Sequence, residues 1–102
     1  MKTIPLTPEI EALALRIIWF ESPAEALEYP NRFMTYAFAR ATEEDMELLR
    51  RYLDEADFME ALENACPGII WPNQWIYWNT RFGRVPVPPM PERKLPDLPG
   101  HA

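Results

Sequence analysis

Few of the residues that commonly carry out catalysis occur in this sequence in a useful arrangement. The only histidine, His101, is the last residue but one, so no histidine-based triad, acid–base pair or zinc site is expected. The only cysteine, Cys66, has no base close to it in sequence that would lower the pKa of its thiol, and we expect it to be structural. Glycine occurs only at positions 68, 83 and 100, which excludes a glycine-rich phosphate-binding loop. The sequence therefore predicts a protein that needs no cofactor and is not an enzyme.

Carboxylates are the most concentrated chemical groups in the chain. Residues 43–63 contain nine acidic residues and two basic ones, a net charge of −7, whereas the whole chain carries −6. Their spacing does not resemble a calcium-binding loop, so no metal site is expected. The acidic stretch is either an ordinary solvated face or a surface that attracts a basic protein partner. In the second case the carboxylates that bind the partner include Glu44 and Glu47.

The stretch from Trp71 to Gly83 is rich in tryptophan. At about 100° per residue, four aromatic side chains fall within roughly 60° of one another on a helix: Trp71, Trp75, Trp78 and Phe82. Pro72 suits the first turn of this helix, and Gly83 suits the left-handed residue that follows its end. Because aromatic rows at this spacing usually face a core, we expect the four side chains to form the central ridge of the core.

A stacking platform for nucleotide bases or another ligand is the alternative interpretation of this ridge. Such platforms need cations beside the rings, and only Arg81 and Arg84 are close in sequence. If the tryptophans are core residues, they contribute strongly to stability, because truncating a buried tryptophan typically costs about 3–5 kcal/mol. Whole domains are stable by only ~5–15 kcal/mol.

Length and composition indicate one folded domain. The chain has 102 residues, of which 48% are hydrophobic and 13% aromatic, which suffices for a modest core despite twelve prolines. A single cysteine excludes an internal disulfide and suits a reducing compartment. Nothing resembles a signal peptide, and the apolar run over residues 10–20 contains charges and is far shorter than the ~20 residues that cross a bilayer. We expect a soluble, cytoplasmic protein that does not enter the membrane.

Capping residues and prolines divide the chain into short helices. The expected helices cover residues 8–20, 23–29 and 31–40, a fourth helix capped by Thr42, a fifth capped by Asp54 or Asp57, and the tryptophan-rich sixth. No strand pattern and no internal repeat is present. We therefore predict an all-α fold: one compact bundle of five to six short helices over residues 1–83, followed by a proline-rich extended tail over residues 84–102.

The first helix is apolar on both sides. Ile10, Leu13 and Ile17 lie on one face, whereas Leu15 and Trp19 point nearly the opposite way. A small domain rarely surrounds a helix completely. This helix is therefore either the central rod of the bundle or has a back face, formed by Leu15 and Trp19, that meets a partner.

The tail contains six of the twelve prolines and favours an extended polyproline II conformation. Two arrangements remain open. The tail is either strapped over the domain by Val85, Val87 and Met90, or it is free. The tail also contains a PxxP motif followed by arginine, from Pro88 to Arg93, which is the form that SH3-type grooves bind.

The fourth and fifth helices could also form a helix-turn-helix, with the fifth helix in the major groove of DNA. Asp57, Glu60 and Glu63 would then face the phosphates, whereas duplex binding depends on lysine and arginine. Charge therefore makes nucleic-acid binding unfavourable, unless arginines gather in space: Arg16, Arg32, Arg40, Arg81 and Arg84.

Several blocks of the sequence together resemble a known family. They are Ile18-Trp19-Phe20, Pro30 with Arg32-Phe33-Met34, Glu43-Glu44-Asp45, Leu48-Leu49-Arg50-Arg51-Tyr52, Ala61-Leu62-Glu63, Pro67-Gly68, Trp75-Ile76-Tyr77-Trp78-Asn79 and Phe82-Gly83-Arg84. Over residues 17–84 the chain resembles a family of small helical proteins encoded beside AbiEii-type nucleotidyltransferase toxins, although Ala39-Arg40-Ala41 stands where a glycine is expected. The resemblance implies an antitoxin-like or accessory role and no catalytic residues.

The leading hypothesis is a non-enzymatic protein-interaction module, the antitoxin-like partner of a nucleotidyltransferase toxin. The acidic helices would attract a basic rim of the partner, and an apolar anchor would come from Leu15 and Trp19 or from Val87 and Met90 of the tail. The alternative function is a small helix-turn-helix-like DNA-binding regulator. Homodimerisation through the first helix is compatible with either.

Overall fold

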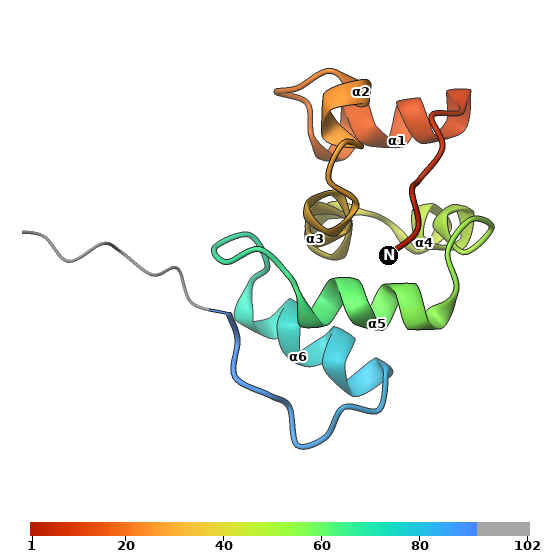
Figure 1. Ribbon diagram of the computed structural model, residues 1–102. Helices are drawn as coiled ribbons and strands as arrows, with labels where there is room; N and C mark the ends of the chain where they lie inside the picture. Colours follow the sequence, from red (N-terminus) through yellow and green to blue (C-terminus); the bar gives the residue numbers. More distant parts are fainter. Residues whose placement is uncertain (92–102) are drawn as a thin grey trace, which may run out of the picture.

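The computed structural model describes residues 1–91, and within these residues the chain forms six helices and no strand (Figure 1). The helices are α1 (Pro8–Ile17), α2 (Pro23–Ala26), α3 (Pro30–Arg40), α4 (Glu43–Leu49), α5 (Glu55–Glu63) and α6 (Pro72–Arg81). The predicted all-α bundle is thus confirmed. None of these six helices has the length and hydrophobicity that a bilayer span requires. His101 and Arg93 of the PxxP motif lie outside the described residues.

Side chains cap the helices where the sequence predicts. The hydroxyl of Thr7 accepts a hydrogen bond from the backbone N–H of Ile10 at 3.1 Å, and Thr42 caps α4 in the same way. Asp54 caps α5 and forms a capping box with Asp57, so Asp54 rather than Asp57 starts that helix. Proline occupies the first turn of four helices, where its missing N–H has no intrahelical partner to lose.

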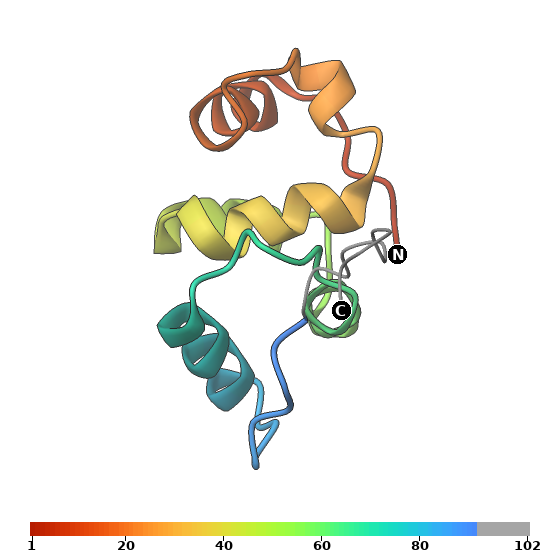
Figure 2. The same ribbon diagram turned by 90° about the vertical axis from the view of Figure 1, so that its left-hand side faces the viewer.

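Helix α3 lies in the middle of the bundle. The pair α1 and α2 lies on one side of it, and α5 and α6 lie on the other side (Figures 1 and 2). The ring of Phe38 on α3 contacts Phe58 on α5 and Trp78 on α6, with ring centroids 6.4 and 5.2 Å apart. Phe33 and Met34 of α3 are fully buried beside them. The core is therefore organised around α3.

Helix α1 is not the central rod of the bundle. It ends at Ile17, earlier than the expected Phe20, and Leu15 on its back face is 48% exposed. The carbonyl oxygen of Ile17 accepts a hydrogen bond from the guanidinium of Arg40 at 2.8 Å. This bond occupies an acceptor that another helical turn would use, and it ties the end of α1 to the end of α3.

The aromatic ridge of α6 is shorter than predicted. Trp75 and Trp78 are 4% and 6% exposed, and Phe82 is partly buried with its ring stacked on Trp78 at 6.1 Å. The prediction for Trp71 was wrong, since its side chain is 69% exposed. Trp71 precedes the first helical residue and has an extended backbone (φ −74°, ψ 152°), so the helical spacing does not apply to it.

The start of the tail is strapped over the domain. Gly83 takes the predicted left-handed conformation (φ +74°) after α6, and residues 84–91 then run without helix. Val87 and Met90 are partly buried against the core, whereas Val85 is 67% exposed and does not contribute. The strapped arrangement is therefore the observed one for residues 84–91.

Candidate functional site

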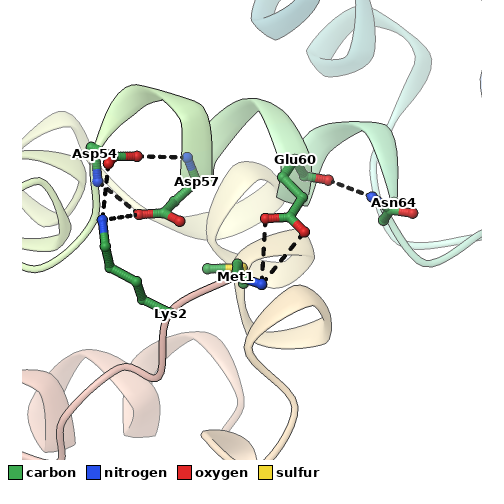
Figure 3. A network of polar contacts seen from close by, with 6 residues as sticks. All are labelled: Met1, Lys2, Asp54, Asp57, Glu60 and Asn64. Carbon is green, nitrogen blue, oxygen red and sulfur yellow. Dashed lines mark hydrogen bonds and ion pairs between the residues drawn. The ribbon is translucent and has the colours of Figure 1, made fainter.

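Cations from the start of the chain pair with three carboxylates at the start of α5 and within it. The ammonium group of Lys2 lies 2.9 Å from the carboxylate of Asp54 and 2.8 Å from that of Asp57, and the amino group of Met1 contacts Glu60 (Figure 3). The hydrogen bond from Lys2, together with the backbone N–H of Asp54, lowers the pKa of Asp57 to about 2. This face of α5, which a helix-turn-helix would turn to DNA, is therefore covered in part by the N-terminal segment.

The first turn of α4 is paired in the same manner. Asp45 accepts two hydrogen bonds from the guanidinium of Arg16 on α1 and one from the backbone N–H of Thr42. The guanidinium of Arg16 is the main reason that the pKa of Asp45 lies below its usual range, against the opposing effect of burial. Glu43 pairs with Arg81 on α6, and this hydrogen bond lowers the pKa of Glu43.

The carboxylates expected to bind a partner are exposed and unpaired among the described residues. Glu44 and Glu47 both lie at the surface, and neither has an ion-pair partner among residues 1–91. Within residues 43–63, Glu55 and Glu63 are the other two carboxylates that are exposed and have no ion-pair partner among the described residues. Because five of the nine carboxylates are paired, the surface field is weaker than a net charge of −7 suggests. We conclude that the acidic helices are a poor candidate for the main site.

A cluster of exposed aromatic side chains lies where α1 ends. Trp19 is 64% exposed, and its ring meets Phe20 edge to face with centroids 5.6 Å apart. Phe20 in turn meets Tyr36 of α3 at 5.8 Å. Leu15 of α1 is also exposed. Of the two residues expected to form the back face of the first helix, Trp19 thus belongs to a larger surface that includes α3.

The guanidinium of Arg40 is held between two rings of this cluster. Its central carbon lies 4.5 Å from the ring centroid of Trp19 and 4.8 Å from that of Tyr36. Arg16, Arg32, Arg51 and Arg81 each pair with a carboxylate, whereas Arg40 has none among the described residues. Within residues 1–91 its guanidinium donates to one acceptor, the carbonyl oxygen of Ile17. Arg40 therefore presents a fixed positive charge with unused donors.

Arg40 also lines a hollow on the protein surface. This hollow, which we call the aromatic groove, has a volume of about 460 Å³ and is lined by Tyr36, Arg40, Gly68, Ile69, Ile70, Trp71, Pro72 and Met90. Trp71 stands 69% exposed at its edge. A volume of this size falls in the range of ligand-binding clefts, about 300–1,000 Å³.

Hydrogen bonds between helix ends hold the groove in shape. The side-chain amide of Gln74 donates to the carbonyl oxygen of Ala39 at 2.8 Å, which joins the start of α6 to the end of α3. The same side chain accepts a hydrogen bond from the backbone N–H of Trp71 at 2.9 Å. Because Arg40 binds Ile17 at the end of α1, the ends of α1 and α3 and the start of α6 converge around the groove.

The tail residues proposed as partner anchors serve the chain itself. Val87 packs against the core, and Met90 forms one wall of the aromatic groove. The indole N–H of Trp75 donates to the carbonyl oxygen of Pro88 at 2.8 Å, which fixes the segment between them. These contacts leave Val87 unsuitable as a free anchor, whereas Met90 contributes to a surface that a partner can reach.

Cys66 is half-buried, and its backbone N–H donates to the hydroxyl of Thr35 at 3.1 Å, in keeping with a structural role. No group of three histidine, cysteine, aspartate or glutamate side chains within residues 1–91 could hold a metal ion.

The aromatic groove could not be predicted from the sequence because its residues come from distant segments. Tyr36 and Arg40 are four residues apart on α3, a spacing at which helix side chains meet, and this was the available signal. The contribution of Trp71 was hidden because helical spacing assigned that side chain to the core.

The comparisons with protein families, curated proteins and solved structures found no match for this chain.

Proposed function

We propose that this protein is a non-enzymatic protein-interaction module, and that the aromatic groove is its docking surface. One observation supports this proposal above the others: Trp71 lines a groove whose arginine stacks on Trp19 and has no carboxylate partner among the described residues, and both tryptophans are about two-thirds exposed. Exposed tryptophan is unfavourable in water, and large apolar surface patches on small proteins usually mark binding sites.

The residue types in the groove suit a protein partner. Tryptophan, tyrosine and arginine are the residues most enriched among those that dominate binding energy at protein interfaces. Trp19, Tyr36, Arg40 and Trp71 supply all three types on one surface. The acidic helices α4 and α5 then contribute long-range attraction through Glu44 and Glu47 rather than contact energy.

The partner we propose is an AbiEii-type nucleotidyltransferase, for which this protein acts as an antitoxin-like regulator. The proposal depends on the resemblance of residues 17–84 to proteins encoded beside such toxins. A DNA-binding role has no comparable support, because α5 carries paired carboxylates and the start of the chain on one face.

Co-purification tests this function. The tagged protein is co-expressed with an AbiEii-type nucleotidyltransferase of the same genome, and both growth and complex formation are measured. We expect a complex and relief of toxicity with the wild-type protein, and with Glu44→Gln/Glu47→Gln a complex that forms more slowly but still relieves toxicity. The Trp19→Ala/Trp71→Ala variant should lose both. Undiminished toxicity with no complex, or a complex that survives loss of both tryptophans, would overturn the proposal.

A further inference from the structure

Helix α6 already binds a proline-rich segment, which is that of its own chain. Residues 84–91 include Pro86, Pro88, Pro89 and Pro91, and they run back along α6 from its end towards its start. The indole N–H of Trp75 donates to the carbonyl oxygen of Pro88, while Val87 and Met90 pack against apolar side chains. Indole donors and aromatic surfaces are the means by which proline-rich peptides are recognised, because their carbonyl groups are free to accept hydrogen bonds.

Trp71, four residues before Trp75 and directly before the start of α6, offers a second site of the same kind. The indole N–H of Trp75 is used by Pro88, and that of Trp78 by the carbonyl oxygen of Phe38 at 2.9 Å. The indole N–H of Trp71 has no acceptor among residues 1–91, and its ring borders the aromatic groove. An extended chain in the groove would thus find a free donor and a flat aromatic wall.

Arg40 adds a charge requirement to this groove. It is the one cation among the groove residues, it lacks a carboxylate among the described residues, and the rings of Trp19 and Tyr36 fix its orientation. A guanidinium held in this way pairs best with a carboxylate that offers two oxygen acceptors. Single-stranded nucleic acid is a poorer match, since binding to a phosphate backbone draws on several cations and this protein has a net charge of −6.

We propose that the aromatic groove binds an extended, proline-rich segment of the partner protein, with a carboxylate side chain on Arg40 and a backbone carbonyl group on the indole of Trp71. This inference rests on the proposed function, because it specifies the chemistry of the partner at the same groove.

A peptide probe tests the inference on the full-length protein. The probe is a fluorescein-labelled twelve-residue peptide of proline and leucine with one central glutamate, and a matched peptide carries glutamine in its place. In fluorescence anisotropy we expect the glutamine peptide to bind about tenfold more weakly, which corresponds to roughly 1.4 kcal/mol. Trp71→Ala should abolish binding of the glutamate peptide. Tyr77→Ala, which removes another half-exposed aromatic side chain of α6 outside the groove, should leave binding unchanged.

The Arg40→Met variant should bind both peptides with equal affinity. Because Arg40 also holds the end of α1, the comparison of the two peptides on the wild-type protein provides a readout that needs no substitution. Equal affinity of both peptides for the wild-type protein, or no binding of either, overturns the inference.

Two further measurements identify other occupants of the groove. If the Trp71 indole of the free protein resists quenching by acrylamide, the groove is filled by the chain itself and the inference is wrong. It is also wrong if light scattering shows a dimer that Trp71→Ala dissociates, since a second copy is then the occupant. Groove-dependent capture of a nucleotidyltransferase without peptide binding would overturn this inference and leave the proposed function standing. Peptide binding without capture of the nucleotidyltransferase would overturn the proposed function and leave the peptide-binding groove standing.

Discussion

The guanidinium of Arg40 stacks on the ring of Trp19, with its central carbon 4.5 Å from the ring centroid. The two residues are 21 positions apart, and they meet because the same guanidinium donates to the carbonyl oxygen of Ile17, two residues before Trp19. One arginine thus ends α1 and keeps a tryptophan at the surface. This relationship joins the fold to the proposed docking surface.

The two ends of the predicted tryptophan ridge should differ sharply in their effect on stability. Trp78→Ala should lower the free energy of unfolding by about 3–5 kcal/mol, because it removes a buried ring and the hydrogen bond to Phe38. Trp71→Ala should change it by less than about 0.5 kcal/mol, because that side chain is exposed. Urea unfolding followed by circular dichroism measures both values. Equal losses would mean that Trp71 is buried after all.

The hydrogen bond from Trp75 to Pro88 should hold the tail against the domain. Trp75→Phe keeps an aromatic ring but removes the indole donor, so we expect a loss of about 1–2 kcal/mol in the free energy of unfolding. Limited proteolysis should then cleave residues 84–91 faster than in the wild-type protein. Tyr77→Phe, a change at an exposed side chain of the same helix, serves as the control. Unchanged cleavage would show that this bond does not fix the tail.

The contact between Lys2 and Asp57 should make part of the stability depend on pH. The pKa of Asp57 is lowered in the folded protein to about 2, so the folded state binds fewer protons than the unfolded state at acid pH. The stabilisation is therefore complete above about pH 4, the ordinary range of an aspartate, and is lost as the pH falls towards 2.

The Lys2→Met variant isolates this contribution. Its urea midpoint should lie below that of the wild-type protein at pH 6, and the difference should shrink between about pH 4 and pH 2, where Asp57 becomes protonated in both proteins. A difference that stays constant over this range would contradict the assignment.

Asp45 should matter more for stability than the exposed carboxylate beside it. Its side chain caps α4 at Thr42 and binds Arg16 of α1, so Asp45→Ala removes several charge-assisted hydrogen bonds and should cost about 1–3 kcal/mol. Glu44→Ala should cost less than about 0.5 kcal/mol, because Glu44 is exposed and unpaired within residues 1–91. Both are measured by urea unfolding at pH 7. Similar costs would show that Asp45 is not a junction between the two helices.

Local signals in the sequence were sufficient to predict the helices but not the surface. Thr7, Thr42 and Asp54 cap helices by hydrogen bonds within three residues, so their neighbours alone reveal them. The end of α1 depends on Arg40, which lies 23 positions from Ile17, and no local pattern contains that bond. The two apolar sides of the first helix left open whether it is the central rod or has an exposed back face, and the exposure of Leu15 and Trp19 decides for the second.

The pairing of charges could likewise not be predicted from neighbouring residues in the sequence. Lys2 neutralises Asp54 and Asp57 across more than fifty positions, so the net charge of residues 43–63 overstated the field of the folded surface. The aromatic groove combines Tyr36 and Arg40 with Trp71, and only the packing of α6 on α3 brings these segments together.

The indole N–H signals of the tryptophans in a ¹⁵N-labelled sample test the central claim most directly, because all four lie within the described chain and differ in environment. On addition of an AbiEii-type nucleotidyltransferase, the indole signals of Trp19 and Trp71 should shift or broaden first. Those of Trp75 and Trp78, which are buried and already hydrogen-bonded, should follow only with the general loss of intensity of a larger complex. Perturbations centred on the backbone amides of Glu44 and Glu47, with the Trp19 and Trp71 signals unmoved, would contradict docking at the aromatic groove.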